Sequence, residues 1–209
     1  NGQASVDGLY LGDYYVKEFS PSVGYLADET EHDLVCNYEG DLVAEVKRDC
    51  TSLEQVMKQP FQIIKAANNG KTDADLLKGA GFTAYLESSL TKKADGNYEF
   101  ASATPVVIGE NGATEMFTDE KGYACSIALP YGTYIVRETT TPHNYTPVDD
   151  FTVRITENNP NQPQTWRVLL DDEFEAKLKI IKQDDETKKP VLQKNTEFKI
   201  YDLDHKKYV

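Results

Sequence analysis

One motif occurs twice in this sequence, and the two copies lie 120 residues apart. Seven identities define it: Gly2, Ala4, Leu9, Gly12, Tyr14, Val16 and Glu18 recur as Gly122, Ala124, Leu129, Gly132, Tyr134, Val136 and Glu138. Both copies alternate and are rich in β-forming residues, as strands are. A repeated strand–turn–strand unit predicts at least two copies of one domain, and it suggests a shared chemical role for the repeated glutamate.

A second repeat marks where a domain opens. Residues 61–65 (Phe-Gln-Ile-Ile-Lys) resemble residues 178–182 (Leu-Lys-Ile-Ile-Lys), and residues 82–85 resemble residues 198–201. We therefore expect opening strands near residues 60 and 177, and closing strands near residues 4 and 124. The predicted order is the C-terminal part of one repeat (1–57), a complete repeat (58–172) and the N-terminal part of a third (173–209). The complete repeat has a common length for a β-sandwich domain.

Composition supports an all-β fold. The chain has 13 Tyr and 8 Phe but only 2 Met, and no window holds a sustained helical stripe. No apolar run is long enough to span a membrane, and no signal peptide is evident. Three cysteines do not make a disulfide framework. Cys36 and Cys50 either meet across a hairpin or stay as free thiols, and the sequence leaves both open.

The charge balance and the missing motifs exclude several functions. Lys and Arg number 22 and Asp and Glu 35, so the net charge is −13, which opposes nucleic-acid binding. The histidines stand alone, and the acidic runs 171–173 and 184–186 lack the spacing of a calcium loop, so we expect no metal. No cofactor loop or catalytic set is present, and an enzyme acting on an external substrate is not expected.

The two repeats together resemble a known family. Residues 132–145 follow the pattern Gly-x-Tyr-x-Val-x-Glu-x-x-x-Pro-x-x-Tyr, and residues 63–65 and 77–82 supply Ile-Ile-Lys and Leu-x-Gly-Ala-x-Phe. This is similar to the B-type repeat of collagen adhesins and SpaA-like pilins of Gram-positive bacteria. The resemblance implies prealbumin-like or reverse-immunoglobulin β-sandwich repeats in tandem. It also implies an extracellular, cell-wall location, a stalk function, and neighbouring repeats of the same protein as partners.

The same resemblance implies a covalent cross-link. Many members of the family join a Lys on the first strand to an Asn or Asp on the last, with a buried Glu as the catalyst. Glu18 and Glu138 match that glutamate. The alternative for each is a solvated or ion-paired glutamate at a strand end. Such chemistry is at most a single self-cross-linking turnover.

The lysine and the acceptor that the family pattern requires are matched less completely than the glutamate. The family pattern puts the nucleophile at Lys179 in the last segment but at Gln62 in the complete repeat, and an amide cannot serve. The acceptor position is Asp171 in the complete repeat and Glu54 in the first segment. Lys179 and Asp171 are therefore the cross-link candidates. We expect no cross-link within residues 58–172, because its nucleophile position holds Gln62.

Two further expectations concern partners. A partial sandwich leaves an open edge and an apolar face, so the segments 1–57 and 173–209 are predicted to pair between molecules.

The alternative to a stalk is an adhesin module that binds a host glycan or matrix protein. Its aromatic platform would come from Tyr131, Trp166 or the group Tyr10, Tyr14 and Tyr15, although aromatics at strand spacing more often lie in a core.

Overall fold

The computed structural model describes residues 2–70, 75–192, 194–203 and 206–209. Its regular elements are strands, apart from two single-turn 3-10 helices, η1 (Glu87–Ser89) and η2 (Glu110–Gly112). The chain divides into two compact units, residues 1–174 and 175–209. The further boundary near residue 57 remains a prediction.

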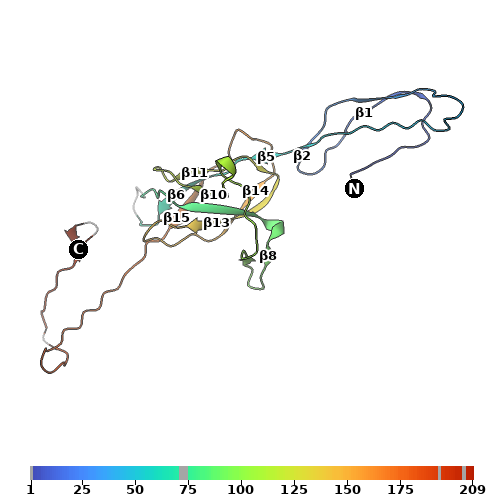
Figure 1. The fold of residues 1–209 in the computed structure, drawn as a ribbon. Helices are drawn as coiled ribbons and strands as arrows, with labels where there is room; N and C mark the ends of the chain where they lie inside the picture. Colours follow the sequence, from blue (N-terminus) through green and yellow to red (C-terminus); the bar gives the residue numbers. More distant parts are fainter. Residues whose placement is uncertain (1, 71–74, 193, 204–205) are drawn as a thin grey trace. The chain divides into compact units, whose positions relative to one another are not determined.

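Two sheets face each other in the middle of the chain (Figure 1). The first has the order β10 (Glu115–Phe117), β7 (Gly81–Leu86), β13 (Gly132–Thr140), β14 (Phe151–Ile155). The second has the order β11 (Tyr123–Cys125), β6 (Gln62–Ala67), β15 (Arg167–Asp171). All neighbouring pairs are antiparallel except β6 and β15, which are parallel. The expected all-β fold is confirmed.

The core lies between these sheets because alternate residues of each strand point inward. Phe61 and Ile63 on one side pack with Phe82, Ala84 and Val136 on the other, and all five are fully buried. Apolar burial of this kind is the main stabilising contribution to a sandwich. Short ladders extend the fold, formed by β5 (Lys58–Gln59) with β12 (Leu129–Pro130) and by β8 (Thr91–Lys92) with β9 (Tyr98–Glu99).

The N-terminal strands reproduce part of this arrangement. β1 (Gly12–Val16) pairs with β3 (His32–Cys36), and β2 (Tyr25–Leu26) pairs with β4 (Gln55–Val56). The first and last residues of β1 pair with the last and first residues of β3. In the same way, the first and fifth residues of β13 pair with the last and first residues of β14. The Tyr14 hydroxyl donates to the carbonyl of Tyr10 at 2.7 Å, and the Tyr134 hydroxyl donates to that of Pro130 at 2.8 Å. The repeated motif therefore forms the same hairpin twice.

The described part of residues 175–209 contains one small hairpin, β16 (Tyr201–Asp202) with β17 (Lys207–Tyr208), and an isolated bridge between Gln183 and Pro190. The strand expected at residues 178–182 is not formed. The matching strand β6 lies between β11 and β15, whereas no strand flanks residues 178–182 within the described part of this unit. A strand without neighbours has no partners for its backbone groups.

Two sequence expectations remain to be placed on the fold. Cys36, Cys50 and Cys125 are all free thiols, so the pairing of Cys36 with Cys50 is not present. Within the described part of the chain, no helix has the length and apolar character needed to cross a membrane.

Candidate functional site

A lysine is completely buried in the sandwich. Lys65 lies in β6 on the same face as Phe61 and Ile63, because side chains two residues apart on a strand share a face. Its side chain has 0% exposure. Gln62 lies on the opposite face, where its amide donates to the carbonyl of Gln164 at 2.8 Å. Phe61 and Ile63 thus decide which face of β6 is the core face.

Lys65 meets two carboxyl groups. Its Nζ donates to Glu138 Oε2 at 2.7 Å and also contacts Asp171 Oδ1, and all three side chains are fully buried. Glu138 comes from β13 and Asp171 from the last residue of β15, so the group joins both sheets. The centroid of the Phe82 ring lies 5.7 Å from Lys65 Nζ, and the ring covers the amine.

This arrangement corrects the sequence analysis. The residues 58–172 do contain a lysine beside Glu138 and Asp171, so the premise for expecting no cross-link there is wrong. Alternation separates Gln62 from Lys65, and Lys65 is on the core side. The signal that sequence reasoning missed is the shared parity of Phe61, Ile63 and Lys65 in one apolar run.

Burial sets the protonation of the two carboxyl groups. It raises the pKa of Glu138 above its ordinary value, against the hydrogen bond from Lys65, which lowers it. Burial likewise raises the pKa of Asp171, again opposed by Lys65. Glu138 Oε1 and Asp171 Oδ2 are buried and have no hydrogen-bond partner among the described residues. One cation facing two buried carboxyl groups favours a proton on one of them, since an unbalanced buried charge is costly.

Backbone contacts hold the three groups in place. The amide of Val148 donates to Glu138 Oε2 at 3.1 Å, and the amide of Asn68 donates to the carbonyl of Asp171 at 2.7 Å. The amide of Lys65 donates to the carbonyl of Gly122 at 2.7 Å. Gly122 has φ +63, and a Cβ there would overlap the carbonyl oxygen of Lys65. This position therefore requires glycine, both for its conformation and for its close approach to β6.

The other predicted site residues are not part of this cluster. Glu18 is half-buried near β1 and accepts a hydrogen bond from the amide of Asp28 at 2.6 Å. That bond lowers the pKa of Glu18, but the hydrogen bond with Glu54, partial burial and repulsion by nearby carboxylates outweigh it and raise the pKa. Lys179 is exposed and belongs to the unit of residues 175–209. The lysine in contact with Asp171 is Lys65.

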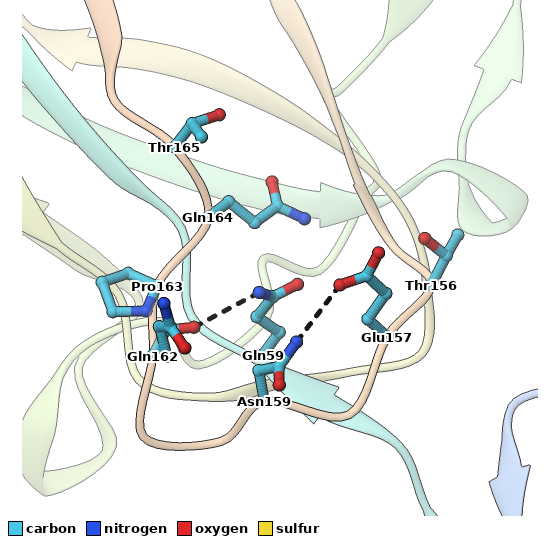
Figure 2. Close-up of a pocket in the computed structure, with 8 residues that line it drawn as sticks. All are labelled: Gln59, Thr156, Glu157, Asn159, Gln162, Pro163, Gln164 and Thr165. Carbon is cyan, nitrogen blue, oxygen red and sulfur yellow. Dashed lines mark hydrogen bonds between the residues drawn. The ribbon is translucent and has the colours of Figure 1, made fainter.

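A separate polar pocket lies beside the loop that precedes β15. It has a volume of about 530 Å³ and is lined by Gln59, Thr156, Glu157, Asn159, Gln162, Pro163, Gln164 and Thr165, which apart from Pro163 carry amide, hydroxyl or carboxyl side chains. Figure 2 shows Gln59 donating to the carbonyl of Gln162 and Asn159 donating to Glu157, at 3.2 Å each. Trp166, next along the chain, is exposed and packs edge-on against Tyr123 with ring centroids 5.1 Å apart.

No group of three or more His, Cys, Asp or Glu side chains suited to a metal ion occurs among the residues that the structure covers. The buried cluster holds a primary amine against a carboxyl group, with a second acid alongside. Such a set can form an amide: the amine attacks, and the second acid transfers protons.

Comparisons with known proteins point to one family. The family model described as the SpaA prealbumin-like fold domain matches residues 60–167. No curated protein sequence matches the chain.

Several solved structures resemble the chain. The Bacillus anthracis TIE protein is 26% identical to it, with 78% of this chain and 25% of that chain covered and a TM-score of 0.49. GBS52, the minor pilin of Streptococcus agalactiae, is 16% identical, with coverages of 86% and 67% and a TM-score of 0.45. The C-terminal domain of the shaft pilin SpaA from Lactobacillus rhamnosus GG is 21% identical, with coverages of 56% and 99% and a TM-score of 0.37. The chain spans about a quarter of the TIE protein chain.

Proposed function

This chain belongs to the family of SpaA prealbumin-like fold domains, and we propose that it is a stalk or pilin-like segment of a Gram-positive surface protein. In this proposal it lies outside the cell, in the wall, between neighbouring repeats of the same protein. The prealbumin-like sandwich and the pilins among its structural neighbours support that role. The excess of acidic over basic residues suits a well-solvated surface on which like charges repel one another.

The second part of the proposal is an amide bond between Lys65 and Asp171. One observation carries it: a fully buried Lys65 Nζ contacts both Asp171 Oδ1 and Glu138 Oε2. The reaction requires a neutral amine, because the lone pair of the nitrogen is the nucleophile. Formation of the amide also removes a pair of buried charges, whose desolvation is otherwise costly.

The reaction balances with one water as the by-product. Once a proton passes from the Lys65 ammonium to the Asp171 carboxylate, Lys65 Nζ attacks the side-chain carbon of the Asp171 carboxylic acid, and a nitrogen–carbon bond forms. Glu138, protonated, hydrogen-bonds the Asp171 carbonyl and gives its proton to the departing hydroxyl, which leaves as water. Glu138 then takes the proton released by the nitrogen and returns to its starting state. Because the groups are held in contact, no encounter step is required.

Intact mass under denaturing conditions tests the bond. The purified chain should weigh one water less than its sequence, and a digest should yield a branched peptide that joins Lys65 to Asp171. A chain of Lys65→Arg should keep the full sequence mass, whereas the exposed control Lys78→Met should still lose water. A wild-type chain with the full mass of its sequence would contradict the cross-link, but it would leave the proposed stalk function unaffected.

The adhesin alternative rests on the polar pocket. Carboxamide and carboxyl groups, with an exposed tryptophan beside them in sequence, are groups that bind hydroxyl-rich ligands such as glycans. A saturable hit on a glycan array that is lost in Glu157→Gln and Trp166→Ala would favour this function.

The pairing of residues 1–57 and 173–209 between molecules also remains a proposal, and self-association in sedimentation experiments tests it.

A further inference from the structure

The polar pocket beside the loop that precedes β15 has walls that the fold already holds in place. This loop is tied to the chain ahead of β6. The amide of Asn159 donates to the carbonyl of Lys58 at 2.9 Å, and the amide of Lys58 donates to Asn158 Oδ1 at 3.0 Å. The amide of Gln164 donates to the carbonyl of Pro60 at 3.0 Å. A ligand therefore meets a preformed site, which reduces the entropy lost on binding.

Carboxamide groups of the lining are held by their nitrogen atoms. Gln59 Nε2 donates to a backbone carbonyl of the loop at 3.2 Å, and Gln164 Nε2 donates to the carbonyl of Arg154 at 2.6 Å. Asn159 Nδ2 donates to Glu157 Oε2 at 3.2 Å (Figure 2). Carbonyl and carboxylate oxygens only accept, so each carboxamide must turn its nitrogen to its partner. The amide oxygens accept no hydrogen bond from any residue that the structure describes, and they are available to the donors of a ligand.

The charge of the lining favours a cation. Glu157 accepts from Asn159 at Oε2, and its Oε1 accepts no hydrogen bond within the described part of the chain. Among the described residues that line the pocket, none is Lys, Arg or His. An anionic ligand would thus meet a like charge and no cation. An ammonium group has N–H donors and no acceptor, and it matches a carboxylate surrounded by amide oxygens.

The polarity of the walls distinguishes a sugar from a basic peptide. Among the described lining residues, Pro163 alone has no polar group in its side chain. The apolar stem of a lysine side chain packs along apolar surface, which this lining does not supply. A sugar ring instead carries hydroxyl groups, which can donate to the amide oxygens and exchange hydrogen bonds with Thr156 and Thr165. The volume of about 530 Å³ lies within the range of small-molecule sites.

We propose that this pocket binds an amino sugar, with the ammonium group against Glu157 and the ring hydroxyls against the amide oxygens of the lining. Sugars that carry sulfate or carboxylate groups in place of the amine are excluded. The inference rests on the adhesin alternative given above, because it names the ligand class of that same pocket. It depends neither on the stalk function nor on the Lys65–Asp171 bond.

Three forms of one oligosaccharide test the inference. The probe is the glucosamine trisaccharide of chitosan, with its amino groups free, N-acetylated or N-sulfated, titrated calorimetrically into the full-length chain at low salt. At about pH 5.5 most of the sugar amines are protonated and an ordinary glutamate is ionised. We expect the free-amine form to bind about fivefold or more tightly than the acetylated form, and the sulfated form not to saturate. Added salt should reduce the preference, since it screens exposed charges.

Two protein variants locate the preference. Glu157→Gln keeps an oxygen for Asn159 but loses the charge, so the free-amine and acetylated forms should then differ by about twofold or less. The matched control Glu120→Gln removes an exposed carboxylate that pairs with Lys78 and does not line the pocket. This control should keep the preference of the unaltered chain.

The outcomes separate this inference from the function on which it rests. Equal affinity for the free-amine and acetylated forms, or a preference that survives Glu157→Gln, would overturn the amino-sugar assignment. Displacement of the free-amine form by an equal or lower concentration of Nα-acetyl-lysine amide would overturn it in favour of a basic peptide. If no form of the trisaccharide binds, the assignment fails. A glycan-array hit that Glu157→Gln removes would in that case still support the adhesin function.

Discussion

Lys65 and Asp171 lie on adjacent parallel strands, and Asp171 is in register with Ala67, two residues beyond the lysine on the same face. The long lysine side chain spans this offset and reaches the carboxyl group at the end of β15. A parallel pair of this kind joins the opening strand of the sandwich to its closing strand. The cross-link would thus connect the two places where the chain enters and leaves the domain.

Glu138→Gln should abolish the amide bond while keeping the shape of the side chain. Glutamine cannot pass a proton to the departing hydroxyl, so the variant should show its full sequence mass under denaturing conditions. Glu157→Gln, at the rim of the polar pocket, is the matched control and should still lose one water. If Glu138→Gln still loses one water, Glu138 does not take part in the reaction.

Lys65→Met should destabilise the sandwich. Methionine fills most of the lysine's volume but leaves two carboxyl groups buried without their cation, and it prevents the cross-link. Breaking a buried ion pair by removing one partner costs about 3–5 kcal/mol, and we expect a loss of at least that order in the free energy of unfolding. Denaturant unfolding measures it. The control Lys78→Met, which removes an exposed partner of Glu120, should change stability by less than about 1 kcal/mol.

The pH dependence of Lys65→Met should report Glu138. Burial raises the pKa of Glu138 from 4.5, and loss of Lys65 removes the hydrogen bond that opposes this shift. A raised pKa means that the folded state binds the proton more tightly, so the stability that it contributes is present at low pH and lost as pH rises through the folded pKa.

The comparison is with Lys65→Met/Glu138→Gln, because neither chain can cross-link. The stability of Lys65→Met relative to this double variant should fall as pH rises from about 4.5 towards neutrality. A constant difference across that interval would show that folding does not raise the pKa of Glu138.

Gly122→Ala should disturb β6 at the lysine. Alanine would have to adopt φ +63, and its Cβ would overlap the carbonyl oxygen of Lys65. Gly112→Ala is a matched control, because Gly112 has φ +81 but nothing within 4 Å of a Cβ. Backbone strain alone should cost the control about 1 kcal/mol, and Gly122→Ala should exceed it by about 1 kcal/mol or more. Equal losses in thermal unfolding would argue against the close contact.

Much of the fold follows from local patterns, and the burial of Lys65 could have been predicted from them as well. Successive side chains of a strand point to opposite faces, so Lys65 shares the buried face of Phe61 and Ile63, and Gln62 lies on the other face. The family pattern puts the nucleophile at Gln62, and following that pattern missed Lys65. The strands that flank β6 could not be predicted in this way, because β11 and β15 are distant from it in the sequence.

The segment 178–182 shows the same dependence on neighbours. Its sequence matches β6 closely, yet it forms no strand, because the described part of its unit supplies no strand on either side. Asp171 and Glu138 both lie in the buried cluster. Asp171 ends β15 and Glu138 lies within β13, and the apolar pattern of both strands is visible in the sequence.

The separation of Lys65 and Asp171 by 106 positions has a consequence for degradation. Once an amide joins them, the intervening residues form a closed covalent ring. The hairpin of β8 and β9 belongs to that ring and exposes Lys92 and Lys93, which trypsin-like proteases recognise. A single cut there would open the ring without dividing the molecule, and two cuts in the ring would be needed to release any fragment of it.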